Sequence, residues 1–349
     1  MTIFSKVRGF LSRNRNKFLV GGAVIGGTVL LTKYAQQKLK DWQEKETREF
    51  LERTRKQQHF ESTEITCNQT ILSLIMTMNE ALSECVNTEE IIASLRDNPD
   101  NKLELWEKLK VLVLTKASCL IYLSVMLVIT LRIQLNVLGG YLFIDPMSIP
   151  SEVQQKYLHL CHNLLDTGLN NISSLIKTEY IKILGPMELK KQLKLKDFEN
   201  IFWAIQTAIA THAKNPINHL NYLVVEDGLY DPHESVLNDM MKATADLLES
   251  DEVKALAAHC INRGFVQLCD QLADYYGKND RIKEVPADTP LNGFVHPGDV
   301  QMPLAKLIPI INGLTSKGSM PDKLIQQLIS NDKLKTFGEN IYECFSHSK

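Results

Sequence analysis

Two uncharged apolar runs constrain this chain most, because each must be buried either in a bilayer or in a protein core. The first run covers residues 18–31 and follows residues 1–17, a basic segment with five Lys or Arg side chains and no acid. The second run covers residues 117–131, between Lys116 and Arg132. A transmembrane helix needs about 20 apolar residues, with about 17 as the lower bound. The two runs therefore have to be judged separately.

The first run is predicted to form a transmembrane anchor over residues 18–34. It reaches the lower length bound because Lys33 can extend its amine to the membrane interface while its stem stays in the apolar layer. A cleavable signal peptide is the alternative, but no persuasive small-x-small cleavage site follows the run. Gly22 and Gly26 form a GxxxG pattern, which would permit close pairing of such anchors.

The second run is predicted to be the buried part of a long central helix. That helix begins near Lys102 and passes Leu138, where Gly139 and Gly140 are expected to end or break it. The uncharged run is too short for a comfortable span. Four polar side chains also interrupt it: Ser118, Tyr122, Ser124 and Thr130. A helix that is apolar all round is typical of the core of a large helical domain.

The rest of the chain is predicted to be helical, so the fold class is all-α. Residues 35–60 form a charged helical spacer, and residues 61–349 form a single large elongated helical bundle around the central helix. Asp251 and Asp332 are expected to cap helices. Further helices are expected at residues 151–184, 189–213, 234–249, 251–276, 303–315, 321–330 and 332–345, with loops at 214–233 and 277–302, and no strand pattern persists.

Composition favours a domain in a reducing compartment. The seven cysteines are an odd number and contain no CxxC pair, which indicates free thiols facing a cytosol-like compartment. A net charge of -2 gives no reason to expect nucleic acid as a partner. The numbers of basic residues before and after the first run are balanced, so charge alone does not orient the anchor.

No catalytic, cofactor or metal constellation is recognised, so we expect a binding protein and not an enzyme. Residues 313–318 imitate a phosphate-binding loop, but Ser319 stands where the lysine is needed. The pair His233 and Glu234 resembles the start of a zinc-protease helix, yet Leu237 replaces the second histidine. His159, Cys161 and His162 lie close together without further ligands nearby. No small-molecule substrate is suggested.

Several strings in the same order resemble the animal-type peroxin three family over the full length of the chain. They include residues 59–62, 101–107, 131–136 with Gly139 and Gly140, 262–265, and 303–306 with 308–313. The resemblance implies a role in peroxisome biogenesis and an N-terminal anchor in the peroxisomal membrane. It also implies that the bulk domain faces the cytosol and that residues 1–17 face the organelle interior. There the domain would dock peroxin nineteen, a soluble receptor for new membrane proteins, through an amphipathic helix from that receptor's N-terminus.

The resemblance also implies the docking residues. Trp106 corresponds to the family's central tryptophan, although helical spacing alone would favour a core role for it. Lys102 and Lys110 are expected to flank the apolar face that carries Trp106. Ile92 departs from the family pattern, which has threonine there. The remaining implied docking residues are Leu95, Lys102, Leu109, Pro303 and Lys306, with Leu142 at the edge.

Two other functions stay open from the residues alone. One is a tethering scaffold on another organelle, such as the mitochondrial outer membrane, because a short anchor flanked by basic residues fits both membranes. The other is a membrane-bound helical enzyme or lipid carrier, which a ligand in a closed internal cavity would favour.

Overall fold

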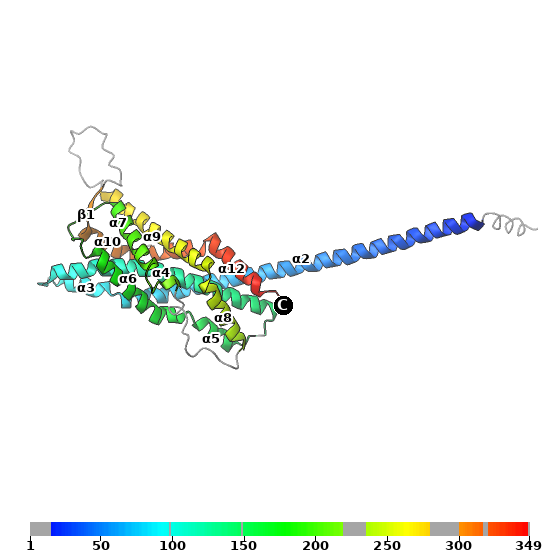
Figure 1. Ribbon diagram of the computed structural model, residues 1–349, viewed down its shortest axis with the longest axis horizontal. Helices are drawn as coiled ribbons and strands as arrows, with labels where there is room; N and C mark the ends of the chain where they lie inside the picture. The colour runs from blue at the N-terminus through cyan, green and yellow to red at the C-terminus, as the bar shows by residue number, and fades with distance from the viewer. Residues whose placement is uncertain are drawn as a thin grey trace, which may run out of the picture. The chain divides into compact units, whose positions relative to one another are not determined.

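The computed structural model describes residues 15–97, 99–147, 149–218, 235–279, 300–316 and 320–347 (Figure 1). Side chains are described from residue 37 onward, except at 39, 41, 43 and 277–279. Residues 1–14 and most of the two expected loops therefore lie outside the described residues, as do the side chains of the expected anchor. The described chain divides into two units, Met1–His59 and Phe60–Lys349. Apart from one short β-ladder, it is all helical, which confirms the predicted fold class.

Helix α2 runs without interruption from Arg15 to Cys85 and so belongs to both units. Between residues 44 and 53 its side chains are exposed and form ion pairs one turn apart, such as Lys45 with Glu49 and Arg53 with Glu49. Each such pair stabilises a helix by only about 0.3–0.5 kcal/mol. The second unit begins where α2 acquires a buried face, with Phe60 as its first buried apolar residue.

Helix α4, Lys102–Ile144, is the central element of the second unit, and helices α3, α5, α6 and α8 to α12 all pack against it. Among the described residues it is the one helix long and apolar enough to cross a membrane. However, 94% of its most apolar window is buried inside the domain. The prediction that residues 117–131 belong to a core helix is therefore confirmed.

Gly139 and Gly140 do not break α4, contrary to the sequence-based expectation. They allow neighbouring helices to approach instead. A Cβ on Gly139 would lie 2.9 Å from Thr63 Cγ2, and a Cβ on Gly140 would lie 2.6 Å from Phe345 Cβ. Real Cβ atoms essentially never come this close, so α2 and α12 contact α4 at positions that only glycine permits.

The outer helices of the second unit are shorter and surround α4 (Figure 1). They are α3 (Thr88–Arg96), α5 (Ser151–His159), α6 (Leu169–Leu184), α7 (Leu195–Ala210), α8 (Ser235–Glu249), α9 (Asp251–Asn279), α10 (Leu304–Ser316), α11 (Met320–Ile329) and α12 (Asp332–Phe345). The expected single helix at residues 151–184 is wrong, because a turn and the π-helix η1 (Leu164–Gly168) separate α5 from α6.

The expected helix at residues 189–213 begins later than predicted. Strand β1, Gln192–Leu193, pairs antiparallel with β2, Met302–Pro303, so that Gln192 lies opposite Pro303. Residues in a ladder hydrogen-bond across to another segment and cannot also donate along a helix. Helix α7 therefore starts at Leu195, after the Lys194 N–H has donated to Asp197 Oδ2 at 2.8 Å.

The two predicted N-caps are each displaced by one residue. Asn331 caps α12, since its Oδ1 accepts from the N–H of Lys333 at 2.9 Å, and Asp332 is the first helical residue. At α9, Ser250 Oγ accepts from the Val253 N–H at 3.3 Å, and Asp251 is again the first helical residue. Each aspartate remains favourable there, because a carboxylate in the first turn interacts well with the helix dipole.

Candidate functional site

Two helices that follow each other in sequence, α3 and α4, and the distant helix α10 form a surface pocket of about 370 Å³ in the second unit. One wall comes from α3, the floor from α4, and the other wall from α10. The lining residues are Glu89, Ile92, Leu95 and Arg96 on α3, Trp106 and Leu109 on α4, and Pro309, Asn312, Gly313 and Ser316 on α10. The pocket combines an apolar centre with charged side chains at its α3 wall.

The α3 wall is fixed by its own N-terminus. Asn87 caps α3, accepting from the Glu90 N–H at 3.1 Å. The next residue, Thr88, is fully buried and donates its hydroxyl to Asn312 Oδ1 on α10 at 2.8 Å. This buried bond joins the two walls and sets their spacing, since an unpaired polar group here would be costly.

The floor comes from the first turns of α4. Leu109 is buried, whereas Trp106 is only half-buried and packs its remaining surface against the core. A large aromatic side chain that is partly covered by its own domain offers a rigid apolar surface to a partner. Lys102 lies one turn before Trp106 and is exposed.

Lys110 does not flank this surface, contrary to the sequence-based expectation. It is 1% exposed and donates to the carbonyl oxygens of Leu184 at 3.1 Å and Met187 at 2.8 Å. It also pairs with Glu107. A lysine ammonium stabilises the carbonyls at the end of a helix, so Lys110 caps the C-terminal end of α6 and is buried there.

The α10 wall is positioned by the β-ladder. The Leu304 and Ala305 N–H groups donate to the carbonyls of Lys191 and Leu189, both at 3.0 Å. Pro309 has no N–H to continue the helix ladder, and Gly313 presents no side chain. An added Cβ on Gly313 would meet nothing within 4 Å. These two residues leave the space that the pocket occupies.

The structure brings together four of the eight docking residues predicted from the sequence: Ile92, Leu95, Trp106 and Leu109. Lys102 lies beside them at the start of α4. Lys306 precedes Pro309 by three residues and Gly313 by seven, so it lies on the same face of α10.

The other two predicted docking residues lie away from the pocket lining. Pro303 belongs to β2, just before α10. Leu142 follows Trp106 by 36 residues in the same helix, which is about 54 Å at 1.5 Å per residue. It is therefore not part of this pocket.

A buried lysine lies close to the lining of the pocket. Lys116, which is 4% exposed, donates to Ser316 Oγ at 3.1 Å. Burial lowers the pKa of Lys116, and the Glu89 carboxylate opposes this by raising it. Lys116 does not line the pocket itself, but it connects a buried amine of α4 to two lining residues, Ser316 on α10 and Glu89 on α3.

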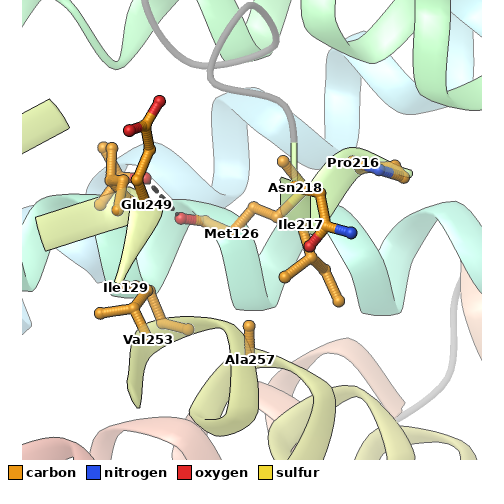
Figure 2. A pocket seen from close by; sticks show the side chains of 10 residues that line it. Met126, Ile129, Pro216, Ile217, Asn218, Glu249, Val253 and Ala257 are labelled. Carbon is orange, nitrogen blue, oxygen red and sulfur yellow. Dashed lines mark hydrogen bonds between the residues drawn. The ribbon is translucent and has the colours of Figure 1, made fainter. Parts of the chain in front are cut away.

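Other hollows of the described chain fit a binding role less well. One cavity has a volume of about 30 Å³. Figure 2 shows residues that line it, among them Met126 and Ile129, Pro216 and Ile217, and Val253 and Ala257. Its volume suits only one or two water molecules, far below the roughly 300–1,000 Å³ of ligand pockets. A depression of about 500 Å³ lies between α9 and α12, but its lining mixes isolated charges with few apolar side chains.

No group of three or more His, Cys, Asp or Glu side chains could hold a metal within the described part of the chain. The rings of His159 and His162 stack on each other with centroids 5.0 Å apart. Cys161 donates to the Leu158 carbonyl at 3.1 Å. These three residues are thus engaged in local contacts.

The fold and pocket together define a class, an all-helical domain with a largely apolar surface pocket that includes Trp106. The Peroxin-3 family model matches residues 9–101, 97–148 and 145–343. Peroxisomal biogenesis factor 3 of Rattus norvegicus is 34% identical over 366 residues, covering 97% of this chain and 96% of the relative. That of Homo sapiens is 34% identical over 368 residues, covering 97% of each chain.

A more distant relative is Peroxisome biogenesis protein 3-2 of Arabidopsis thaliana, 24% identical over 247 residues that cover 63% of this chain and 67% of the relative. A relative in Komagataella phaffii is named a peroxisomal membrane protein; it is 22% identical and covers 63% of each chain. The chain belongs to the Peroxin-3 family and has a role in peroxisome biogenesis.

Proposed function

We propose that this protein is a docking receptor on the peroxisomal membrane that binds an amphipathic helix of peroxin nineteen in the pocket between α3, α4 and α10. The observation that carries this proposal is the convergence of Ile92, Leu95, Trp106 and Leu109 on one surface pocket. In this proposal residues 18–34 anchor the chain by a single span, and the second unit lies in the cytosol. Binding the receptor there would deliver new membrane proteins, without any catalytic step.

The physical logic is recognition of a helix in a groove. An amphipathic helix presents apolar side chains at i, i+3, i+4 and i+7, and a trough of matching width accepts them. Trp106 is the largest side chain that lines the pocket, and a tryptophan in such a position tends to dominate the binding energy. The charges of Lys102 and Arg96 at the rim would favour a partner helix whose apolar stripe is bordered by acids.

The first test is the substitution Trp106→Ala in the second unit, with a labelled N-terminal helix of peroxin nineteen as the ligand. We expect a loss of about 2–4 kcal/mol in binding, because truncation removes a central aromatic contact. Circular dichroism and thermal melting should show a folded domain, since Trp106 is only half-buried. A folded variant that binds as well as wild type would contradict the proposal.

A second variant tests the same site without removing any contact. Gly313 faces open space in the pocket, so Gly313→Leu should fold and fill the cavity. Helix propensity alone should raise stability by up to about 1 kcal/mol. We expect the partner helix to bind at least roughly tenfold more weakly through this added obstruction. The matched control Gly313→Ala adds only a methyl group and should weaken binding less.

A further inference from the structure

A second exposed surface lies on α2, away from the pocket. Between Glu64 and Glu80 the sequence has 15 residues without a charged side chain. One face of this stretch belongs to the core, with Cys67, Ile71 and Ile75 buried. The opposite face is exposed, although exposed helix faces usually carry charges.

The exposed face carries a regular apolar stripe. Ile65 is 59% exposed, Leu72 42% and Met76 66%, and the exposed Gln69 lies between them. Their spacing of four, three and four residues keeps them on one side of a helix with 3.6 residues per turn. This alternation is the a/d pattern by which two helices pair side by side. We call these four residues the α2 stripe.

The flank of the stripe offers few hydrogen bonds to a partner or to solvent. Thr66 donates its hydroxyl to the Ser62 carbonyl at 3.0 Å, and Thr70 donates to the Thr66 carbonyl at 2.8 Å. Both donors are therefore satisfied within the helix itself. A face with satisfied polar groups, no charge and exposed apolar side chains has the composition of an interface centre.

The chemistry of the stripe matches a second copy of itself. In a parallel pair every side chain meets its own counterpart, so a charged face would oppose like charges. The uncharged stripe avoids this repulsion, and Gln69 can hydrogen-bond to the partner's Gln69 at the seam. The proposed anchor would also insert all copies in the same orientation, which is the geometry a parallel pair requires.

We propose that two copies of this protein, anchored in the same membrane, pair through the α2 stripe. This inference rests on the proposed membrane anchor. Three apolar side chains per copy are too few for a standard interface of about 800 Å² per partner. Confinement to one membrane raises the effective concentration and favours the pair there. We therefore expect the second unit alone to be monomeric in solution.

The test uses the full chain in liposomes, with the two exposed cysteines replaced by Cys85→Ser and Cys344→Ser. Gln69→Cys places a thiol on the stripe without removing an apolar side chain. The control Ser174→Cys places one on an exposed position of α6. A short bis-maleimide should link the Gln69→Cys chains at least roughly tenfold more than the Ser174→Cys chains, as expected for a specific pair and not for random collision.

Adding a charge to the stripe should abolish this cross-link. In the Gln69→Cys background, Leu72→Glu puts two like charges at the seam, and Met76→Glu does so at a more exposed position. The matched control Thr77→Glu adds the same charge to an exposed residue about a third of a turn away from the stripe and should leave the cross-link unchanged.

Equal cross-linking of the Gln69→Cys and Ser174→Cys chains would contradict the proposed pairing. The absence of any cross-link between Gln69→Cys chains would contradict it too. Shielding of Gln69→Cys from a membrane-impermeant maleimide at one copy per liposome also overturns it, because lipid then covers the face. Titration of the same liposomes with the peroxin nineteen helix separates the two proposals. Leu72→Glu should bind that helix as wild type does, so loss of pairing with retained docking leaves the proposed function intact.

Discussion

Arg132 is the largest fully buried side chain of the described core and is neutralised by a single acid. Its Nη1 donates to Glu64 Oε1 at 2.8 Å and to Oε2 at 2.9 Å. Its Nη2 donates to Asn68 Oδ1 at 3.3 Å and to the Ile329 carbonyl at 3.2 Å. The cluster joins α2, α4 and α11, so the point at which α2 enters the second unit depends on one guanidinium.

Removing the acid should therefore destabilise the domain strongly. We expect Glu64→Leu to lower the free energy of unfolding by about 3–5 kcal/mol, because it leaves the guanidinium buried without a counter-charge. The double variant Glu64→Leu with Arg132→Met should recover most of this loss. Urea denaturation of the second unit measures both. Equal losses in the single and double variants would mean that the charge pair is not the cause.

The thiols should differ sharply in reactivity. Cys85 and Cys344 are exposed, and the other five cysteines are buried. Burial raises the pKa of Cys67 to about 12, an effect that Arg132 opposes and Glu64 reinforces. We expect a maleimide at pH 7 to modify two thiols in the folded chain and seven in guanidinium, counted by mass spectrometry. Rapid modification of Cys67 in the folded state would contradict its burial.

The same Cys67 shift has a consequence for stability against pH. The folded-state pKa lies above the ordinary value of 9.0, so the folded chain holds its proton after the unfolded chain has lost it. The contribution to stability is fully present below pH 9 and is lost as the pH rises from about 9 to about 12. Cys67→Ala should flatten this part of the stability profile, measured by denaturation at a series of pH values.

At the scale of elements, the contact between α4 and α12 depends on a missing side chain. A Cβ on Gly140 would lie 2.8 Å from the backbone carbonyl carbon of Phe345, which cannot move as a side-chain tip can. We expect Gly140→Ala to cost about 1–3 kcal/mol by overpacking. Gly313→Ala, with open space around its Cβ, should instead gain up to about 1 kcal/mol. Thermal melts should show a lower melting temperature for Gly140→Ala and a higher one for Gly313→Ala. A change in the same direction for both variants would contradict this explanation.

Sequence reasoning succeeded for elements whose pattern is local. The apolar run in α4 and the helical spacing from α8 to α12 predicted helices that the structure contains. It failed where a distant neighbour decides the local structure. Gly139 and Gly140 look like helix breakers until Thr63 and Phe345 are seen to contact them. The delayed start of α7 depends on pairing with residues more than a hundred positions away.

The residues of the candidate site show the same difference between local and long-range signals. Ile92, Leu95, Trp106 and Leu109 lie within 18 consecutive positions, and the family resemblance indicated them together. The resemblance also indicated Lys306 on α10, but it missed the residues of α10 that line the pocket, Pro309, Asn312, Gly313 and Ser316. Only folding brings them to α3, through the bond between Thr88 and Asn312. The available signal was a proline and a glycine on one face of a predicted helix, Pro309 and Gly313. Together they remove both a backbone donor and side-chain volume from a surface.

At the scale of the whole molecule, the two units have different roles in the proposed function: the first carries the membrane anchor and the second binds the partner. In the first unit, the side chains described between residue 37 and His59 include none that is buried, whereas the second unit holds all the buried apolar residues described. Partner recognition is therefore expected to reside in the second unit alone. Membrane attachment and pairing of copies should instead require the full chain.

The most direct measurement is a titration of residues 41–349 with a labelled N-terminal helix of peroxin nineteen, followed by fluorescence anisotropy. Circular dichroism on the same sample establishes that the domain is folded. We expect saturable binding, and weaker binding when Gly313→Leu places a side chain in the pocket. A folded wild-type domain that does not bind the helix would contradict the docking function, whatever the outcome for pairing through the α2 stripe.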